Sequence, residues 1–264
     1  MEGLTPEAIG ACAALVARGD PDRFQAVMAA PVAARGRLFV LYAFNLEVAR
    51  APWVTQEALI AEMRLQWWRD VLAEAAEGKP ARGHEVAAPL HGLIRACDVP
   101  VAVLDRLVEA RRQDIWREPF SDDSALGGYL EATGAGLMWA AGRCLGAAQA
   151  DEAALRDLGW AAGMAAYLRA VPELLARGRQ PLIREDAETI AAMARAGLAR
   201  LARGRAGAGR MAAPARAATL AAWQAGGLLR LAEAEPERVQ RGDLRLSEFG
   251  RRWGLLRAGW RGGL

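Results

Sequence analysis

The 264-residue sequence contains very little lysine and cysteine, and both shortages narrow its classification. Lys79 is its only lysine, so nearly every cationic side chain is a guanidinium, which we attribute to Arg-biased codon usage. Cys12, Cys97 and Cys144 form an odd, scattered set without a CxxC pair. This pattern excludes a disulfide framework and a cysteine zinc site, and it favours a reducing compartment.

The motifs of the common enzyme classes are also missing. His84 and His91 are the only histidines, and neither has the sequence context of a general base. No serine lies in a nucleophile-elbow motif, and neither a phosphate-binding loop nor a dinucleotide fingerprint is present. The sequence therefore gives no support for a hydrolase or a nucleotide-binding enzyme.

Long hydrophobic runs and a secretion signal are absent as well. The longest uncharged apolar runs, 132–142 and 217–229, fall short of the ~18 residues that indicate a membrane span. The first ten residues, MEGLTPEAIG, are acidic where a signal peptide carries positive charge. We expect a cytoplasmic protein that is soluble or attaches peripherally to the inner membrane.

The composition favours a single all-α domain over residues 1–264. Hydrophobic residues make up 53% of the chain, with abundant Ala and Leu and few β-branched runs. A net charge of +3 is too small to indicate a nucleic-acid partner. The Gly/Arg run 203–210 lacks interleaved aromatics, so we interpret it as a flexible link rather than a nucleic-acid contact.

Capping residues and prolines define the helix boundaries. Thr5 and Asp20 are placed to cap the first two helices, each followed by a proline at its first position. Further helices are predicted over 39–53, 57–76, 86–97, 100–116, 124–145, 151–177, 188–203 and 214–233, with Pro172 interrupting the one that contains it. The expected core stripe of the 57–76 helix is Leu59, Ile60, Met63, Trp67, Val71 and Leu72.

Two of these helices carry features that indicate a site. The 39–53 helix is apolar on all sides and therefore buried, yet Asn45 and Glu47 lie in its second half. Such groups need polar partners or a solvated cavity, and a simple polar contact between helices is the preferred interpretation. The 151–177 helix carries a stripe of small residues that either admits a close neighbour or leaves room for a ligand: Gly159, Ala162, Gly163, Ala166 and Ala170.

Several segments, in this order and spacing, resemble the squalene/phytoene synthase family over nearly the whole chain. They are Asp22–Phe24, Leu41–Phe44, Arg64–Asp70, Thr133–Leu137, Leu158–Gly159, Leu168–Arg169, Arg177–Arg179 and Leu182. The resemblance implies an all-α type I isoprenoid synthase fold. It also implies head-to-head joining of two prenyl diphosphates, with Mg²⁺ held by aspartates on two facing helices.

Both aspartate motifs that this resemblance implies are degenerate. The positions of the first motif hold Ala49, Arg50 and Trp53. The positions of the second motif hold Ala166, Ala170, Glu173 and Leu174. A single glutamate cannot hold a magnesium cluster, and a guanidinium at the first motif would exclude the metal. We therefore expect no catalytic residues, no bound metal and no cofactor, since Mg²⁺ is needed only if the chain is an enzyme.

The sequence is most similar to the branch of this family that lacks the aspartates and serves in the assembly of respiratory complex I. That branch implies a non-catalytic assembly factor or chaperone at the membrane surface, with complex I subunits or assembly intermediates as partners. The residual pocket that could hold an isoprenoid or another lipid is expected at Tyr42, Asn45, Glu47, Gly163 and Arg169. The alternatives are a farnesyl or geranylgeranyl diphosphate transferase that has replaced its metal ligands, and a lipid-binding module without an assembly role.

The C-terminal segment 250–264 is basic and aromatic. Its arginines alternate with apolar residues and no acid is present, a composition typical of interfacial helices at anionic lipid. The candidate membrane contacts are Arg251, Arg252, Trp253, Arg257 and Trp260. The alternative, which the glycines of the segment favour slightly, is a terminal helix packed on the bundle with its arginines in water.

Overall fold

The computed structural model describes residues 4–116 and 118–264, and within them it contains helices and no strands. The predicted all-α fold is thereby confirmed. The α-helices of the first half are α1 (Pro6–Gly19), α2 (Pro21–Ala29), α3 (Val32–Arg50), α4 (Ala58–Ala76), α5 (Ala87–Ala96), α6 (Val101–Ala110) and α7 (Arg112–Trp116). Those of the second half are α8 (Asp123–Leu130), α9 (Gly136–Cys144), α10 (Glu152–Ala176), α11 (Ala187–Ala208), α12 (Ala213–Arg216), α13 (Ala225–Ala234), α14 (Glu237–Arg241) and α15 (Glu248–Arg261).

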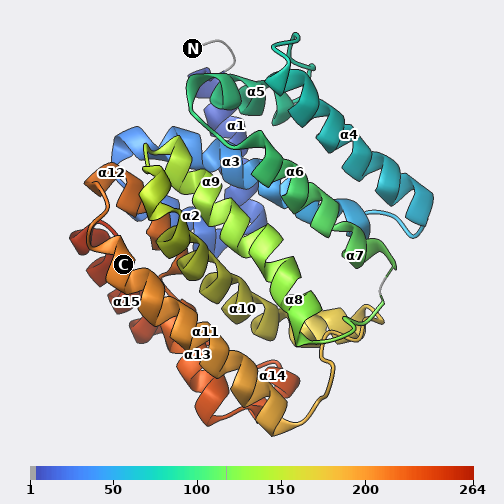
Figure 1. Cartoon of the computed structure of the whole chain (residues 1–264), viewed down its shortest axis with the longest axis vertical. Helices are drawn as coiled ribbons and strands as arrows, with labels where there is room; N and C mark the ends of the chain where they lie inside the picture. Colours follow the sequence, from blue (N-terminus) through green and yellow to red (C-terminus); the bar gives the residue numbers. More distant parts are fainter. Residues whose placement is uncertain (1–3, 117) are drawn as a thin grey trace.

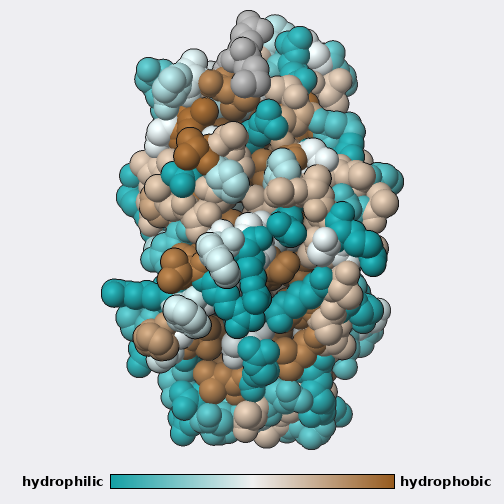
Figure 2. Space-filling view, turned by 90° about the vertical axis from the view of Figure 1, so that its left-hand side faces the viewer, coloured by the Kyte–Doolittle hydropathy of each residue, from teal (hydrophilic) through white to brown (hydrophobic). Residues whose placement is uncertain are grey.

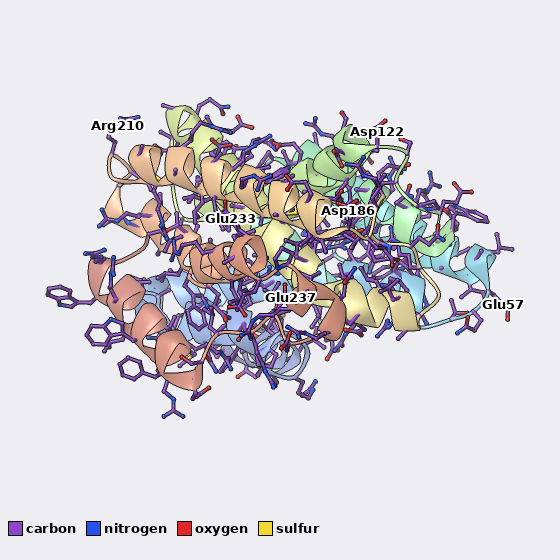
Figure 3. The ribbon with its side chains drawn as sticks, turned by 90° about the horizontal axis from the view of Figure 1, so that it is seen from below. Glu57, Asp122, Asp186, Arg210, Glu233 and Glu237 are labelled. Atoms are coloured by element: carbon purple, nitrogen blue, oxygen red, sulfur yellow. The ribbon has the colours of Figure 1, made fainter. Side chains whose placement is uncertain are left out.

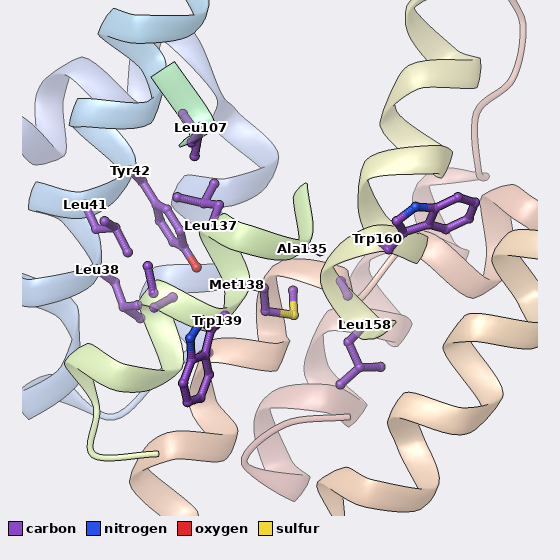
Figure 4. Packing of buried hydrophobic residues seen from close by; sticks show 14 of the residues in the cluster. Leu38, Leu41, Tyr42, Leu107, Ala135, Leu137, Met138, Trp139, Leu158 and Trp160 are labelled. Atoms are coloured by element: carbon purple, nitrogen blue, oxygen red, sulfur yellow. The ribbon is translucent and has the colours of Figure 1, made fainter. Parts of the chain in front are cut away.

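Short helical turns connect several of these elements. They are the 3₁₀ turns η1 (Ala51–Trp53), η3 (Gln149–Asp151) and η4 (Ala217–Ala222), and the π-helical turn η2 (Glu131–Ala135). The helices surround α10, which packs against α9, η2, α11 and α13 (Figure 1). Buried side chains from the first and second halves of the chain meet in one hydrophobic core, part of which Figure 4 shows around Met138 and Trp139.

The predicted helix starts at Thr5 and Asp20 are confirmed in atomic detail. The Thr5 hydroxyl accepts a hydrogen bond from the Ala8 amide at 3.2 Å, and the Asp20 carboxylate accepts one from the Arg23 amide at 3.0 Å. Each side chain thus satisfies an amide that the first turn leaves without an intrahelical partner.

Two predicted interruptions of helices are wrong. Helix α10 continues through Pro172 to Ala176, and the buried side chains of Leu168 and Val171 anchor the turn before the proline in the core. Helix α11 continues to Ala208 through the presumed flexible link. A Cβ atom at Gly204 would lie 2.6 Å from Leu158 Cγ, so this glycine permits close packing of α11 on α10 rather than chain flexibility.

The predicted core face of α4 is wrong in its N-terminal half. Leu59 and Met63 are 72% and 64% exposed, and Ile60 is also exposed. The residues of this helix that enter the core are Ala61, Leu65, Trp68, Val71, Leu72 and Ala75. The apolar residues of the first two turns nearly encircle the helix, so their periodicity does not identify the buried side. An apolar patch consequently lies in water at the start of α4.

Candidate functional site

A cavity of about 230 Å³ lies between α3 and α10, where the resembled family carries its two aspartate motifs. One wall is formed by Asn45 of α3 and Trp53 of η1. The opposite wall is the predicted small-residue stripe of α10, including Gly163. The stripe also admits a neighbour at its other end, because a Cβ on Gly159 would lie 2.5 Å from the Gly134 carbonyl oxygen.

Each of the two degenerate aspartate motifs contributes apolar side chains to the lining of this cavity. Ala166, Ala170 and Leu174 follow one another at four-residue steps along the α10 wall. Glu173, the only acid left in the two motifs, is exposed and forms an ion pair with Arg177 at 2.5 Å. On the α3 side, Ala49 is half-buried and Arg50 is exposed at a separate pocket.

A buried polar cluster of four side chains lies at one end of the cavity. Asp114 and Arg179 are 3% and 1% exposed and form a close ion pair. Asp114 also accepts hydrogen bonds from the Tyr129 hydroxyl at 2.8 Å and from Arg111 at 3.3 Å. Arg111 donates a further hydrogen bond to the Tyr129 oxygen at 2.5 Å. Every oxygen of the Asp114 carboxylate is therefore engaged by protein donors.

The charge of this cluster is net positive. Two guanidiniums face one carboxylate, and Arg23 contributes a third cation to the cavity lining. Burial acts to lower the pKa of Arg111, but the neighbouring Tyr129 and Asp114 outweigh it, so this pKa lies above its usual value. The Nε atoms of Arg111 and Arg179 and the Nη2 atom of Arg179 are buried without a hydrogen-bond acceptor. Three arginines and one carboxylate therefore give the cavity lining a net positive charge, which attracts an anionic group.

These residues do not fit a magnesium cluster. Among the residues that the structure describes, no group of three His, Cys, Asp or Glu side chains is placed to hold a metal ion. Asp114 is the carboxylate that reaches the cavity, and its two arginine partners already neutralise it. Glu131 lies outside and pairs with Arg156 and Arg200.

The structure does not bring the five predicted pocket residues together. Asn45 and Gly163 line the cavity. The Tyr42 ring is buried in the core beside Arg23, whose guanidinium lies 4.9 Å from the ring centre. Arg169 is exposed on another side of α10, where it pairs with Asp22 at 2.8 Å.

Glu47 lies at a second pocket of about 310 Å³ between α3 and α4. Two residues separate Glu47 from Ala49, a rotation of about 200° around the helix, which turns its carboxylate away from the first cavity. The second pocket is also lined by Arg50, Ala51, Val54, Arg64, Trp67, Trp68 and His84. Trp68 is buried in the core, whereas Trp67, which was predicted to face the core, is half-buried.

The C-terminal segment forms the regular helix α15, which packs on the bundle. Its buried side is small, consisting of Ala258 with Gly254 against Trp223 and Gly259 against Ala29. The predicted membrane residues divide between the two sides of the helix. Arg251 is half-buried and pairs with Asp22 at 2.7 Å. The other four are exposed, and of these Arg252 pairs with Glu248 at 2.8 Å.

Sequence reasoning missed the Arg179 and Tyr129 members of the polar cluster. Asp114 lies in a charge-rich stretch of sequence, which by itself is typical of an exposed helix-end ion pair. Its partner Arg179 is 65 residues away in the sequence. No local spacing connects the two, so only the packing of α7 against the segment after α10 brings them together.

Comparisons with known proteins support the family resemblance that the sequence indicated. The family model described as squalene/phytoene synthase matches residues 16–189. The chain is 31% identical over 179 residues to the Drosophila melanogaster homolog of NADH dehydrogenase (ubiquinone) complex I assembly factor 6, covering 65% of this chain and 53% of that protein. The Bos taurus assembly factor 6 is 26% identical over 163 residues, covering 61% of this chain and 48% of that protein.

The chain therefore spans about half the length of the curated relatives that it matches. Among solved structures, a dehydrosqualene synthase superposes with a TM-score of 0.80 at 14% identity, with 95% of each chain covered. At this identity the superposition establishes a shared fold, the helical fold of the terpenoid synthases.

Proposed function

Because this chain belongs to the squalene/phytoene synthase family, while its curated relatives are complex I assembly factors, we propose that it is a non-catalytic assembly factor for respiratory complex I. Its partners would be complex I subunits or assembly intermediates. The assembly role rests on relatives of which the chain spans about half, and the loss of catalysis rests on the site itself.

The apolar walls of the α3–α10 cavity are the observation that carries the non-catalytic part of the proposal. Ionisation of a prenyl diphosphate needs metal ions to neutralise the departing charge. Ala166, Ala170 and Leu174 supply no ligand for such ions on the α10 wall. The cavity volume of about 230 Å³ also lies below the roughly 300 Å³ at which small-molecule pockets usually begin. Two prenyl chains do not fit in this space.

Titration of the purified protein with farnesyl and geranylgeranyl diphosphate, with and without Mg²⁺, tests this conclusion. We expect no hydrocarbon product and no dependence of binding on Mg²⁺. Metal-dependent binding together with a new hydrocarbon would establish the prenyltransferase alternative and refute the proposal.

A second candidate function, binding of an anionic lipid or isoprenoid without chemistry, is favoured by the positive charge that Arg23, Arg111 and Arg179 bring to the cavity lining. In the same titration, this function predicts Mg²⁺-independent binding that Arg179→Gln weakens. Arg106→Gln, which removes an exposed guanidinium on α6, is the matched control. Equal binding by the two variants would contradict a ligand site in the cavity.

The exposed apolar patch at the start of α4 is the surface that we assign to the protein partner. Val54, Leu59, Ile60 and Met63 are all exposed, and exposed apolar patches of this kind mark protein contacts. Side chains this exposed contribute little to folding, so Leu59→Ser with Met63→Ser changes the free energy of unfolding by less than about 1 kcal/mol.

Co-purification of complex I subunits with the tagged full chain tests this surface. We expect recovery of subunits with the wild type and their loss with the Leu59→Ser/Met63→Ser variant. Val32→Ser, at another exposed apolar position 76% exposed, is the control that retains them. If the α4 variant recovers complex I subunits as well as the wild type does, this surface is not the partner contact.

A further inference from the structure

Helix α15 presents its large apolar side chains to water instead of to the core. Phe249, Trp253, Leu256 and Trp260 are 77%, 56%, 64% and 89% exposed. They follow one another at steps of four, three and four residues, which places them on one helical face. The rings of Phe249 and Trp253 stack with their centres 6.5 Å apart. The small residues of the helix face inward, so the apolar face has no partner within the described part of the chain.

A pocket of about 430 Å³ lies beside this helix and is lined by four arginines from three elements. They are Arg205 of α11, Arg230 of α13, and Arg257 and Arg261 of α15. No aspartate or glutamate is among the residues that line it. Within residues 4–116 and 118–264, none of the four forms an ion pair, whereas most other arginines do.

The arginines of this pocket repel one another. Burial lowers the pKa of Arg205 first of all, and the neighbouring charges of Arg230 and Arg257 lower it further. Like charges held together without a counter-ion indicate a site that an anion stabilises. Guanidinium groups bind phosphate oxygens bidentately, so a phosphate is the group that the pocket suits best.

We infer that the apolar face of α15 and the four-arginine pocket together dock the protein on a bilayer that contains anionic phospholipid. The aromatic rings enter the interfacial layer, and the arginines bind a lipid phosphate. This chemistry matches the amphipathic helices that lie in the membrane plane, with aromatic residues on the apolar side and arginines beside them. A helix of 14 residues is about 21 Å long, too short to span the bilayer, and none of the described helices is long and apolar enough to cross a membrane.

The position of α15 leaves the surface accessible. The helix lies along the outer edge of the molecule, with several of its side chains directed away from the bundle (Figure 3). Hydrophilic and hydrophobic side chains alternate over the adjoining side of the molecule (Figure 2). The inference does not depend on the assembly role, because it rests on α15 and its neighbours alone.

Co-flotation of the full chain with vesicles tests the inference. One set of vesicles is pure phosphatidylcholine, and the other is an equal mixture of phosphatidylcholine and phosphatidylglycerol. We expect binding to the anionic vesicles that is at least about tenfold stronger than to the neutral ones. This preference should shrink as salt is raised, because screening shortens the Debye length from about 10 Å at 0.1 M to about 3 Å at 1 M.

Two double variants separate the contributions. Arg230→Gln/Arg257→Gln should weaken binding to the anionic vesicles by about tenfold or more. Trp253→Ser/Trp260→Ser should weaken binding to both kinds of vesicle. Arg95→Gln/Arg106→Gln removes the same charge from exposed positions on α5 and α6, and should bind like the wild type.

Each variant is checked for an unchanged helical circular dichroism spectrum before use. Equal binding of the wild type to neutral and anionic vesicles would overturn the inference. An equal loss of binding in the two arginine double variants would also overturn it, because net charge rather than the pocket would then explain the attraction.

Discussion

At the scale of single residues, the buried Asp114 is the group on which the polar cluster depends. It is the carboxylate that balances Arg111 and Arg179, and its removal leaves two largely buried guanidiniums without a counter-charge. We expect Asp114→Asn to lower the free energy of unfolding by about 3–5 kcal/mol, measured by urea denaturation.

Asp105→Asn is the matched control for this prediction. Asp105 binds Arg69 through both oxygens at 2.7 and 3.1 Å, but the two side chains are about one-third exposed. Its loss should cost about 0–1 kcal/mol. A similar loss in the free energy of unfolding for the two variants would show that the buried Asp114 cluster stabilises the protein no more than an exposed ion pair does.

At the scale of helices, the crossing of α10 and η2 depends on two glycines in contact. A Cβ on Gly159 would lie 2.5 Å from the Gly134 carbonyl oxygen, and backbone cannot move aside as a side chain does. Gly159→Ala should therefore lower the free energy of unfolding by about 1–3 kcal/mol. Gly128→Ala in α8, where a Cβ meets nothing within 4 Å, should instead raise it by up to about 1 kcal/mol. The same sign for both variants in urea denaturation would contradict this account.

Asp22 joins α15 to α2 and α10 by accepting hydrogen bonds from Arg251 and Arg169 at 2.7 and 2.8 Å. Burial acts to raise the pKa of Asp22, but Arg169 and Arg251 outweigh it, so this pKa lies below its usual value. A lowered folded-state pKa stabilises the protein above about pH 4, and this stabilisation is lost as pH falls through the folded value. Asp22→Asn should thus lower the urea concentration at the midpoint of unfolding at neutral pH.

The difference in midpoint between wild type and Asp22→Asn should shrink as the pH is lowered below 4. The exposed pair of Glu188 and Arg195 provides the control, since Glu188→Gln should change the midpoint little at any pH. A difference that stays constant with pH would show that the charge of Asp22 does not hold α15 in place.

These helices also show how far the sequence determines the structure. Their existence follows from composition, and the caps at Thr5 and Asp20 are local, so both are predictable. The buried side of α4 is not predictable from the sequence, because the apolar residues of its first turns nearly encircle the helix. The role of Gly204 was missed for a related reason, since a glycine in a linker and one at a close helix crossing look the same in sequence. The cluster of Asp114 and Arg179 depends on contacts between distant segments, which no local pattern encodes.

At the scale of the whole molecule, the two proposed surfaces lie far apart. The start of α4, near Glu57, and the C-terminal helix α15 are on opposite sides of the bundle in both views (Figures 1 and 3). A protein docked on a bilayer through α15 would therefore present the α4 patch away from the lipid. This arrangement would allow the membrane and a protein partner to be bound at the same time.

The separation predicts that the two surfaces fail independently. Leu59→Ser/Met63→Ser should abolish recovery of complex I subunits and leave flotation with anionic vesicles at the wild-type level. Trp253→Ser/Trp260→Ser should weaken flotation with both kinds of vesicle and retain subunit recovery from detergent extracts. Loss of both properties in a variant that keeps its helical circular dichroism spectrum would contradict the separation and would mean that partner and lipid share one surface, because exposed side chains on opposite sides of the bundle do not contact the same partner.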